Sequence, residues 1–516
     1  MSSSHDPMVL RSAADLTLET LDAVAWENRR LMLHPQLLDA LATTRAGMLR
    51  ALADGRHAYG VTTGMGYLAT VDLDEEARHT QQANLLLGRA VGGPPFLDHG
   101  EARAVLVARL ASFLGGQAGV TPDLCGFLVD RLNDDFTPAI PRSGIGCAGE
   151  IIPLAHAFGP MSGIGQVLVA HSDDEGDREM AAPLVASAAA ALAERGVSPY
   201  QPAEKEGIAL LAGAPGAVAL AAAHLRAVRA LSGQLLVAAA CAIDAIQAPL
   251  SAYTPAVAQL ASDPLMAEVL AHLGDLLRSS VRPEGHAPQA PVSFRVIPQV
   301  LTHLARTLDR LEEDLRRALA AVTDSPAFVN GQFVTSGGFH AIGLAADLDY
   351  LCIALVQAAE LAGQHIHRLL DARFTRLPDQ LTLMPGPRTG LVVVHKRAVG
   401  MLNELRRLAS PATVGLADTS MGQEDAMTFT FEAADKLRRA ESLLRDLIAC
   451  ELLVCRQVWF LRAFPVASGL EEQAALLAAM IPPIEYDRPL GADIARLSDL
   501  LAAGHLTGKH VSESNS

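Results

Sequence analysis

The sequence has few aromatic residues and few charges for its length. Phe, Trp and Tyr make up 4% of the 516 residues and Asp, Glu, Lys and Arg 19%, whereas half of the residues are apolar. Disorder is excluded for most of the chain, because so apolar a composition supports a large core. Scarce aromatics beside abundant Ala and Leu favour helices packed on helices over a β-sandwich.

Basic charge is also in short supply. The 41 Lys and Arg residues stand against 57 Asp and Glu residues, which leaves a formal net charge of −16. A nucleic-acid partner needs a cationic surface for its phosphates. We therefore expect no nucleic-acid partner.

Signals for metals, disulfides and membranes are missing as well. The six cysteines form no Cys-x-x-Cys pair, and no histidine pair has metal-ligand spacing, so we expect no metal site and no disulfide framework. The first residues lack the basic and apolar regions of a signal peptide. Unbroken apolar runs such as 235–243 are shorter than the ~20 residues that cross a bilayer. The sequence therefore predicts a soluble, cytoplasmic protein with no membrane partner.

Helical periodicity dominates the strongly patterned parts of the chain. Apolar residues recur every three or four positions within 301–319, 344–355 and 437–447, with charged residues on the opposite face of the first stretch. These stretches predict the core of an elongated helical bundle, and hence an all-α fold. We expect an N-terminal domain at 1–200, which carries the Gly-rich loops, and a domain at 201–516 with the long-helix bundle and the C-terminal helices.

Five loop segments occur in a fixed order along the chain: Tyr59-Gly-Val-Thr-Thr-Gly-Met-Gly66, Gln82-Ala-Asn-Leu-Leu-Leu-Gly-Arg-Ala90, Gly146-Cys-Ala-Gly-Glu-Ile-Ile-Pro-Leu-Ala-His156, Gln289-Ala-Pro-Val-Ser-Phe-Arg-Val-Ile-Pro-Gln299 and Gln423-Glu-Asp425. Weaker matches lie at 206–213 and 331–340. Together they resemble the histidine/phenylalanine/tyrosine ammonia-lyase family. The resemblance implies a fumarase/aspartase-type helical bundle that assembles as a homotetramer, with active sites built from loops of several subunits.

The sequence departs from this family where the family builds its electrophile. Family members cyclise an internal Ala-Ser-Gly to a methylidene-imidazolone, and the Ser loses its hydroxyl as water. The matching residues here are Cys147, Ala148 and Gly149, and Ala148 has no leaving group. We therefore expect no methylidene-imidazolone and no other cofactor. Further family positions have changed too, namely an Asn to Ala212, an Asp to Ala290, a Tyr to Val292 and an Asn to Gly338.

Other positions of the family's pocket are retained. By resemblance, Tyr59 is the catalytic base, Arg295 clamps the substrate carboxylate with its guanidinium fork, and Glu424 belongs to the catalytic group. The remaining matches are predicted to bind substrate; they are Asn84, Arg89, Gln289, Phe339 and Gln423. Arg89 stands where histidine-specific members have His, and could supply a second cationic contact.

Each of these residues also has a purely structural interpretation. Tyr59 could be a packed tyrosine, and Arg295 could form a structural ion pair. Cys147 could be a small buried hydrophobe instead of a nucleophile. Gln423 and Glu424 could cap a helix that starts near Asp425.

Three hypotheses of function follow. The first is an enzyme that uses Tyr acid–base chemistry and Arg carboxylate binding for elimination, conjugate addition, cyclisation or isomerisation of a small amino-acid-derived carboxylate, in specialised biosynthesis. The second is a catalytically silent homologue that binds a ligand or partner. The third is an ammonia-lyase or aminomutase with an unusual electrophile.

Overall fold

The computed structural model describes residues 6–169, 184–282 and 288–507. It divides the chain into two compact units, each assembled from three stretches. Unit 1 comprises 1–223, 311–348 and 412–435, and unit 2 comprises 224–310, 349–411 and 436–516. From the sequence we expected a single division after residue 200.

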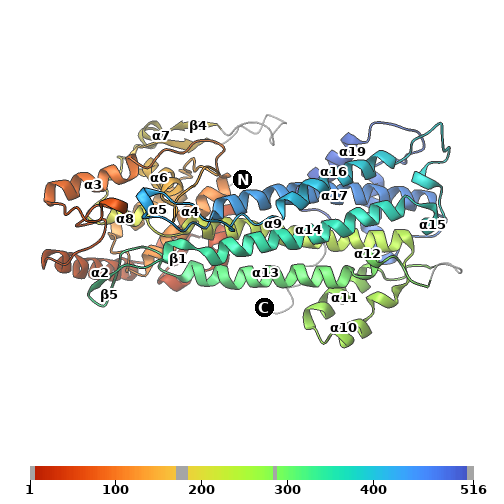
Figure 1. Ribbon diagram of the computed structural model, residues 1–516, viewed down its shortest axis with the longest axis horizontal. Coiled ribbons are helices and arrows are strands. Elements are labelled where there is room, and N and C mark those ends of the chain that lie inside the picture. Colours follow the sequence, from red (N-terminus) through yellow and green to blue (C-terminus); the bar gives the residue numbers. More distant parts are fainter. Residues whose placement is uncertain (1–5, 170–183, 283–287, 508–516) are drawn as a thin grey trace. The chain divides into compact units, whose positions relative to one another are not determined.

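Unit 1 contains short and medium helices and three small two-stranded sheets (Figure 1). Here α1 packs on α4, α3 on α8, and α6 on α8. The helices are α1 Leu18–Trp26, α2 Pro35–Ala53, α3 Glu75–Leu87, α4 His99–Leu114, α5 Pro122–Asn133, α6 Ile151–Phe158, α7 Ala188–Glu194 and α8 Glu206–Leu211. The strands are β1 Met8–Leu10 parallel to β2 Leu31–Leu33, β3 Gln166–Leu168 antiparallel to β4 Val185–Ser187, and β5 Ala327–Val329 antiparallel to β6 Gln332–Val334.

Four long helices have residues in both units: α9 Pro215–Ile246, α13 Ile297–Ala320, α14 Ile342–Leu369 and α17 Thr430–Leu461. The all-α prediction is confirmed, and the three apolar stripes predicted from the sequence lie in α13, α14 and α17. Leucines of these stripes such as Leu304, Leu348 and Leu444 are fully buried. Helix α9 was not singled out, because it is apolar on nearly all sides and so shows no one-sided stripe.

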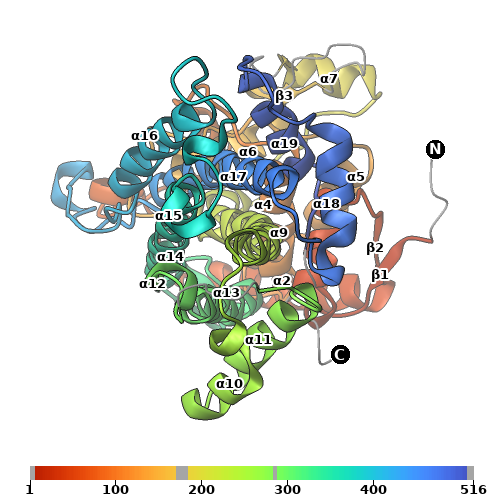
Figure 2. The ribbon, with the colours of Figure 1, turned by 90° about the vertical axis from the view of Figure 1, so that its right-hand side faces the viewer.

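In unit 2, ion pairs link neighbouring helices of the bundle in addition to their apolar packing. Lys436 of α17 pairs with Asp349 of α14, and Arg439 of α17 pairs with Glu404 of α16. Figure 2 looks along these helices. The unit's other helices are α10 Pro255–Ala261, α11 Pro264–Leu276, α12 Val292–Arg295, α15 Ala372–Thr375, α16 Val392–Leu408, α18 Glu471–Met480 and α19 Gly491–Ala502.

Short 3₁₀ turns complete the structure, and they lie at 13–15, 66–68, 159–162, 250–253, 338–340, 379–381, 420–422 and 468–470. Two helical stretches, 206–246 and 338–369, are long and apolar enough to cross a membrane by length and composition. Neither stretch was predicted from the sequence, because polar and charged residues interrupt its apolar runs. Their most apolar windows are 89% and 56% buried inside the protein, and core helices of soluble proteins pass the same test.

Candidate active site

Tyr59 lies at the start of a tight loop between α2 and α3. Its Oη accepts a hydrogen bond from the backbone N–H of Gly66 at 2.7 Å, so the ring folds back over its own loop. Gly60 and Gly66 both have positive φ angles (68° and 60°), which glycine adopts without strain. Because the phenol oxygen is the acceptor in this bond, its proton is left for another partner, such as a substrate atom.

Arg89 follows the end of α3 and is half-buried beside Tyr59 and Glu424. Burial lowers the pKa of its guanidinium, and the charges of Tyr59 and Glu424 act in the opposite direction. Its hydrogen bonds run to the Leu85 carbonyl oxygen (3.3 Å) and, weakly, to the Met65 sulfur (3.8 Å). Neither of these partners is an anion, so this cation remains suited to bind a negatively charged ligand.

Glu424 connects this cluster to the altered triplet. One carboxylate oxygen accepts the backbone N–H of Ala148 at 3.0 Å, and the other accepts the Ser420 hydroxyl at 2.9 Å. The alternative in which Gln423 and Glu424 cap a helix near Asp425 is wrong, because α17 begins only at Thr430. The structure thus brings Tyr59, Arg89, Glu424 and Ala148 into one cluster.

Cys147 is buried, and its thiol donates to the carbonyl oxygen of Gly149 at 3.0 Å. Burial raises the pKa of this thiol to about 11. A thiol with this pKa stays protonated at neutral pH and is a poor nucleophile. The structure therefore favours the interpretation of Cys147 as a small buried residue.

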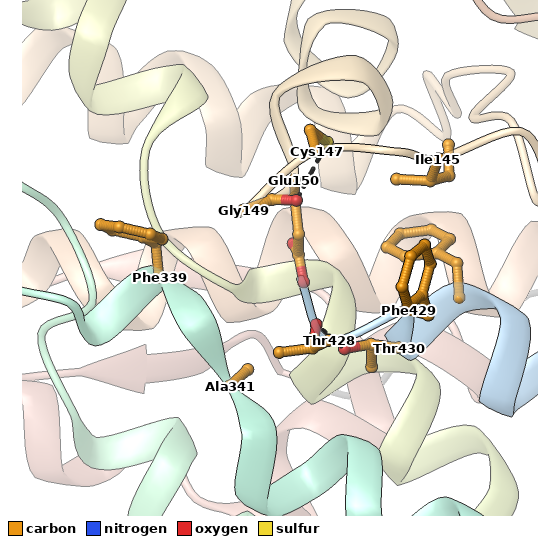
Figure 3. Close-up of a pocket in the computed structure, with 10 residues that line it drawn as sticks. Ile145, Cys147, Gly149, Glu150, Phe339, Ala341, Thr428, Phe429 and Thr430 are labelled. Carbon is orange, nitrogen blue, oxygen red and sulfur yellow. Dashed lines mark hydrogen bonds between the residues drawn. The ribbon is translucent and has the colours of Figure 1, made fainter. Parts of the chain in front are cut away.

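A narrow pocket of about 10 Å³ lies against the triplet, and Figure 3 shows ten residues that line it. Cys147, Gly149 and Phe339 contribute to it, as does Glu150. Both Glu150 oxygens accept backbone N–H groups of the first turn of α9, from Gly216 and Ala217, at 2.6 Å. Burial nevertheless raises the pKa of Glu150 to about 7.

Two buried charges near the triplet were not predicted from the sequence. Glu150 is one of them, although it directly follows Gly149 in the chain. Arg109 is fully buried, donates to the carbonyl oxygen of Ala212, and stacks on Phe158. Arg109 lies in an apolar stretch of α4 and belongs to no sequence motif that would have identified it.

Other predicted substrate-binding residues lie at the surface of unit 1. Asn84 in the last turn of α3 and Gln423 after the 3₁₀ turn at 420–422 are both exposed. Phe339 is half-buried and lines the triplet pocket.

Arg295 and Gln289 belong to unit 2. Gln289 is exposed, whereas Arg295 ends α12, is half-buried, and donates from Nε to the carbonyl oxygen of Ala290 at 3.1 Å. Within the parts of the chain that the structure describes, Arg295 forms no ion pair. In the same described ranges, no three His, Cys, Asp or Glu side chains gather as they would to hold a metal ion.

Comparisons with known proteins give one consistent result. The model of the family described as aromatic amino acid lyase matches residues 16–480. A histidine ammonia-lyase of Symbiobacterium thermophilum is 31% identical over 502 residues, which cover 96% of each chain. The tyrosine aminomutase structure from Streptomyces globisporus superposes with a TM-score of 0.86 at 26% identity, covering 97% of this chain and 98% of the other. An ergothioneine-degrading ergothionase from Treponema denticola has a TM-score of 0.90 at 21% identity, with 97% and 99% covered, which shows the shared fold.

Proposed function

This chain belongs to the aromatic amino acid lyase family, and on that premise we propose that it is a lyase-like enzyme that works without the methylidene-imidazolone electrophile. Its substrate is a small amino-acid-derived carboxylate. Its reaction is elimination of a group that leaves more readily than ammonia, or the reverse addition, including cyclisation, or an isomerisation.

The observation that carries the proposal is the cluster of Tyr59, Arg89 and Glu424 beside a triplet with no leaving group. The family's electrophile requires a residue that loses water at the middle position, and Ala148 carries only a methyl group. Ala212 likewise lacks the side-chain amide that family members have there. The residues present do not fit this group, so we derive no step through it.

Acid–base chemistry remains available to the cluster. Tyr59 acts in its deprotonated form, after its phenol has given its proton to the solvent, and its oxygen takes a proton from the carbon next to the one that bears the leaving group. The electrons of that C–H bond form the new double bond, and the leaving group departs with its bonding pair. The Arg89 cation stabilises the negative charge of the phenolate before it takes this proton, and Glu424 is the second group able to exchange a proton.

The anchor in this proposal is Arg295, whose guanidinium binds the substrate carboxylate in two parallel hydrogen bonds, with Gln289 as a further polar contact. We also propose, from family membership, a cytoplasmic homotetramer and a role in specialised biosynthesis.

The leaving group decides which substrates can react. An amine leaves poorly unless a covalent electrophile assists it, whereas a quaternary ammonium or a sulfur substituent leaves as a stable molecule. The likeness in fold to an ergothioneine-degrading enzyme makes ergothioneine a reasonable member of a test panel.

The test begins with the intact mass and near-ultraviolet spectrum of the purified chain. We expect the encoded mass; a deficit of two water molecules would contradict the proposal. The chain is then incubated with His, Phe and Tyr, their α-trimethylammonium forms and ergothioneine, and products are followed by mass spectrometry. Turnover of plain amino acids at the rates of ordinary members would favour an unusual electrophile, and binding without any turnover would favour a silent homologue.

A further inference from the structure

The segment that carries Arg295 is held by two buried side chains of unit 2. The Tyr253 hydroxyl donates to the carbonyl oxygen of Phe294 at 2.9 Å. A ring nitrogen of His365, Nε2, lies 3.1 Å from the carbonyl oxygen of Ser293. The Phe294 ring also packs on the His365 ring, with 4.3 Å between centroids. Consecutive backbone carbonyls directly before Arg295 therefore have fixed partners.

The protonation of His365 follows from its two neighbours. Nε2 faces a carbonyl oxygen, which can only accept, so this nitrogen carries a proton. Nδ1 lies 2.7 Å from a carboxylate oxygen of Glu451 on α17, and the two side chains are 3% and 2% exposed. Glu451 thus orients the ring so that its N–H points at Ser293.

A second buried His–Glu pair in the same unit differs in one respect. His224 Nδ1 lies 2.7 Å from Glu441, here between α9 and α17 where the first pair joins α14 and α17, with side chains 3% and 9% exposed. Its other ring nitrogen has no hydrogen-bond partner in the described structure. In both pairs the distance from Nδ1 to the carboxylate oxygen is 2.7 Å and the side chains are buried. Only His365 also bonds, through its other ring nitrogen, to the backbone of another segment.

We propose that His365, oriented by Glu451, is a positioning residue for Arg295, and that Tyr253 assists it. The pair sets the conformation of 290–295 and so the direction of the guanidinium that receives the substrate carboxylate. This inference rests on the proposed role of Arg295. Misplacement of a binding group by about 1 Å can cost on the order of 100-fold, so a hydrogen bond to this segment can affect recognition strongly.

The test measures discrimination between two probes that differ only in the carboxylate. They are trans-3-(imidazol-4-yl)acrylate and its primary amide, and their Kd values are compared by calorimetry. A charged hydrogen bond to the carboxylate predicts a preference for the acid of roughly 10- to 100-fold. Arg295→Gln should abolish this preference.

Variants of the two pairs separate positioning from stability. His365→Phe keeps a ring against Phe294 but removes the bond to Ser293, and we expect most of the preference to disappear. His224→Phe is the matched control, and should keep the preference within about twofold, although it loses a similar amount of stability. Glu451→Gln, which still offers an amide to Nδ1, should retain more of the preference than His365→Phe.

The outcomes are distinguishable. The anchor role in the proposed function fails if the wild type binds the acid and the amide equally well. It also fails if Arg295→Gln keeps the wild-type preference for the acid. If Arg295→Gln abolishes the preference but His365→Phe keeps it, only the positioning inference is overturned. Should His365→Phe fail to fold, Tyr253→Phe removes a single hydroxyl from the same segment, and an unchanged preference there would overturn the inference.

Discussion

Two neighbouring parts of unit 1 differ in what they have kept. The triplet at 147–149 has lost the side chain on which the family's electrophile depends, whereas Tyr59 and Glu424 keep a phenol and a carboxylate. The two parts are joined by the hydrogen bond from the Ala148 N–H to Glu424. Under the proposed function, this difference means that the site relies on acid–base chemistry and not on covalent capture of the substrate.

The triplet loop is held by contacts that do not depend on the lost hydroxyl. Glu424 binds the backbone N–H of Ala148, and the Cys147 thiol bonds to the loop's own carbonyl at Gly149. A loop held through its backbone can change side chains without changing its path. This explains how the cluster around Tyr59 persists beside an altered triplet.

The largest effect on kcat is expected at Tyr59. Tyr59→Phe removes the phenol oxygen and should lower kcat by roughly 10²- to 10⁴-fold, the usual contribution of a general base. Tyr67→Phe, an exposed tyrosine eight residues further on, is the matched control and should leave kcat unchanged. Steady-state rates on the substrate found in the panel check this, and a fully active Tyr59→Phe would contradict the assignment of the base.

Glu424→Gln should have the next largest effect. The amide keeps the shape of the side chain but cannot exchange a proton, so we expect kcat to fall roughly 100-fold, at the lower end of the range for acid–base groups. The neighbouring exposed Asp425→Asn serves as the control. If both variants show equal rates, Glu424 only holds the triplet loop in place.

A stability effect is expected on the triplet side of the comparison, at Glu150. Its folded-state pKa of about 7 lies above the ordinary value of 4.5. Between these pH values the unfolded chain releases a proton that the folded chain keeps, so the free energy of unfolding falls as pH rises from 4.5 to 7 and is then constant. The pKa difference of 2.5 between the folded and unfolded chain corresponds to a fall of roughly 3 kcal/mol in the free energy of unfolding, at 1.36 kcal/mol per pKa unit.

Glu150→Gln removes this titration and should flatten the pH dependence relative to the wild type. Urea unfolding at pH 5 and pH 8 measures it, with the exposed Glu76→Gln as a control that keeps the wild-type slope. Identical slopes for Glu150→Gln and the wild type would show that Glu150 ionises normally.

The smallest effect is expected at Cys147. Because its thiol stays protonated well above neutral pH, Cys147→Ala should change kcat by less than about threefold, as for a small buried residue outside the chemistry. Iodoacetamide at pH 7 should leave Cys147 unmodified, as judged by peptide mass spectrometry. A large loss of kcat would restore Cys147 as a candidate nucleophile and would contradict the view that the triplet takes no part in the chemistry.

Much of the fold and part of the site could be predicted from sequence. The stripes at 301–319, 344–355 and 437–447 identify helices because a one-sided apolar face repeats with the helical period. The helix start near Asp425 was wrong by five residues, because a 3₁₀ turn and a loop precede α17.

The sequence by itself determined the family, the all-α class and the absence of a leaving group at Ala148, since these depend on residue types, order and period. Tertiary packing was needed to bring Arg89 within electrostatic range of Tyr59, Glu424 into a hydrogen bond with Ala148, and His365 onto the backbone before Arg295. These contacts join residues from 30 to more than 250 positions apart. Such pairs carry no periodic signal, because their proximity depends on how whole helices and loops pack.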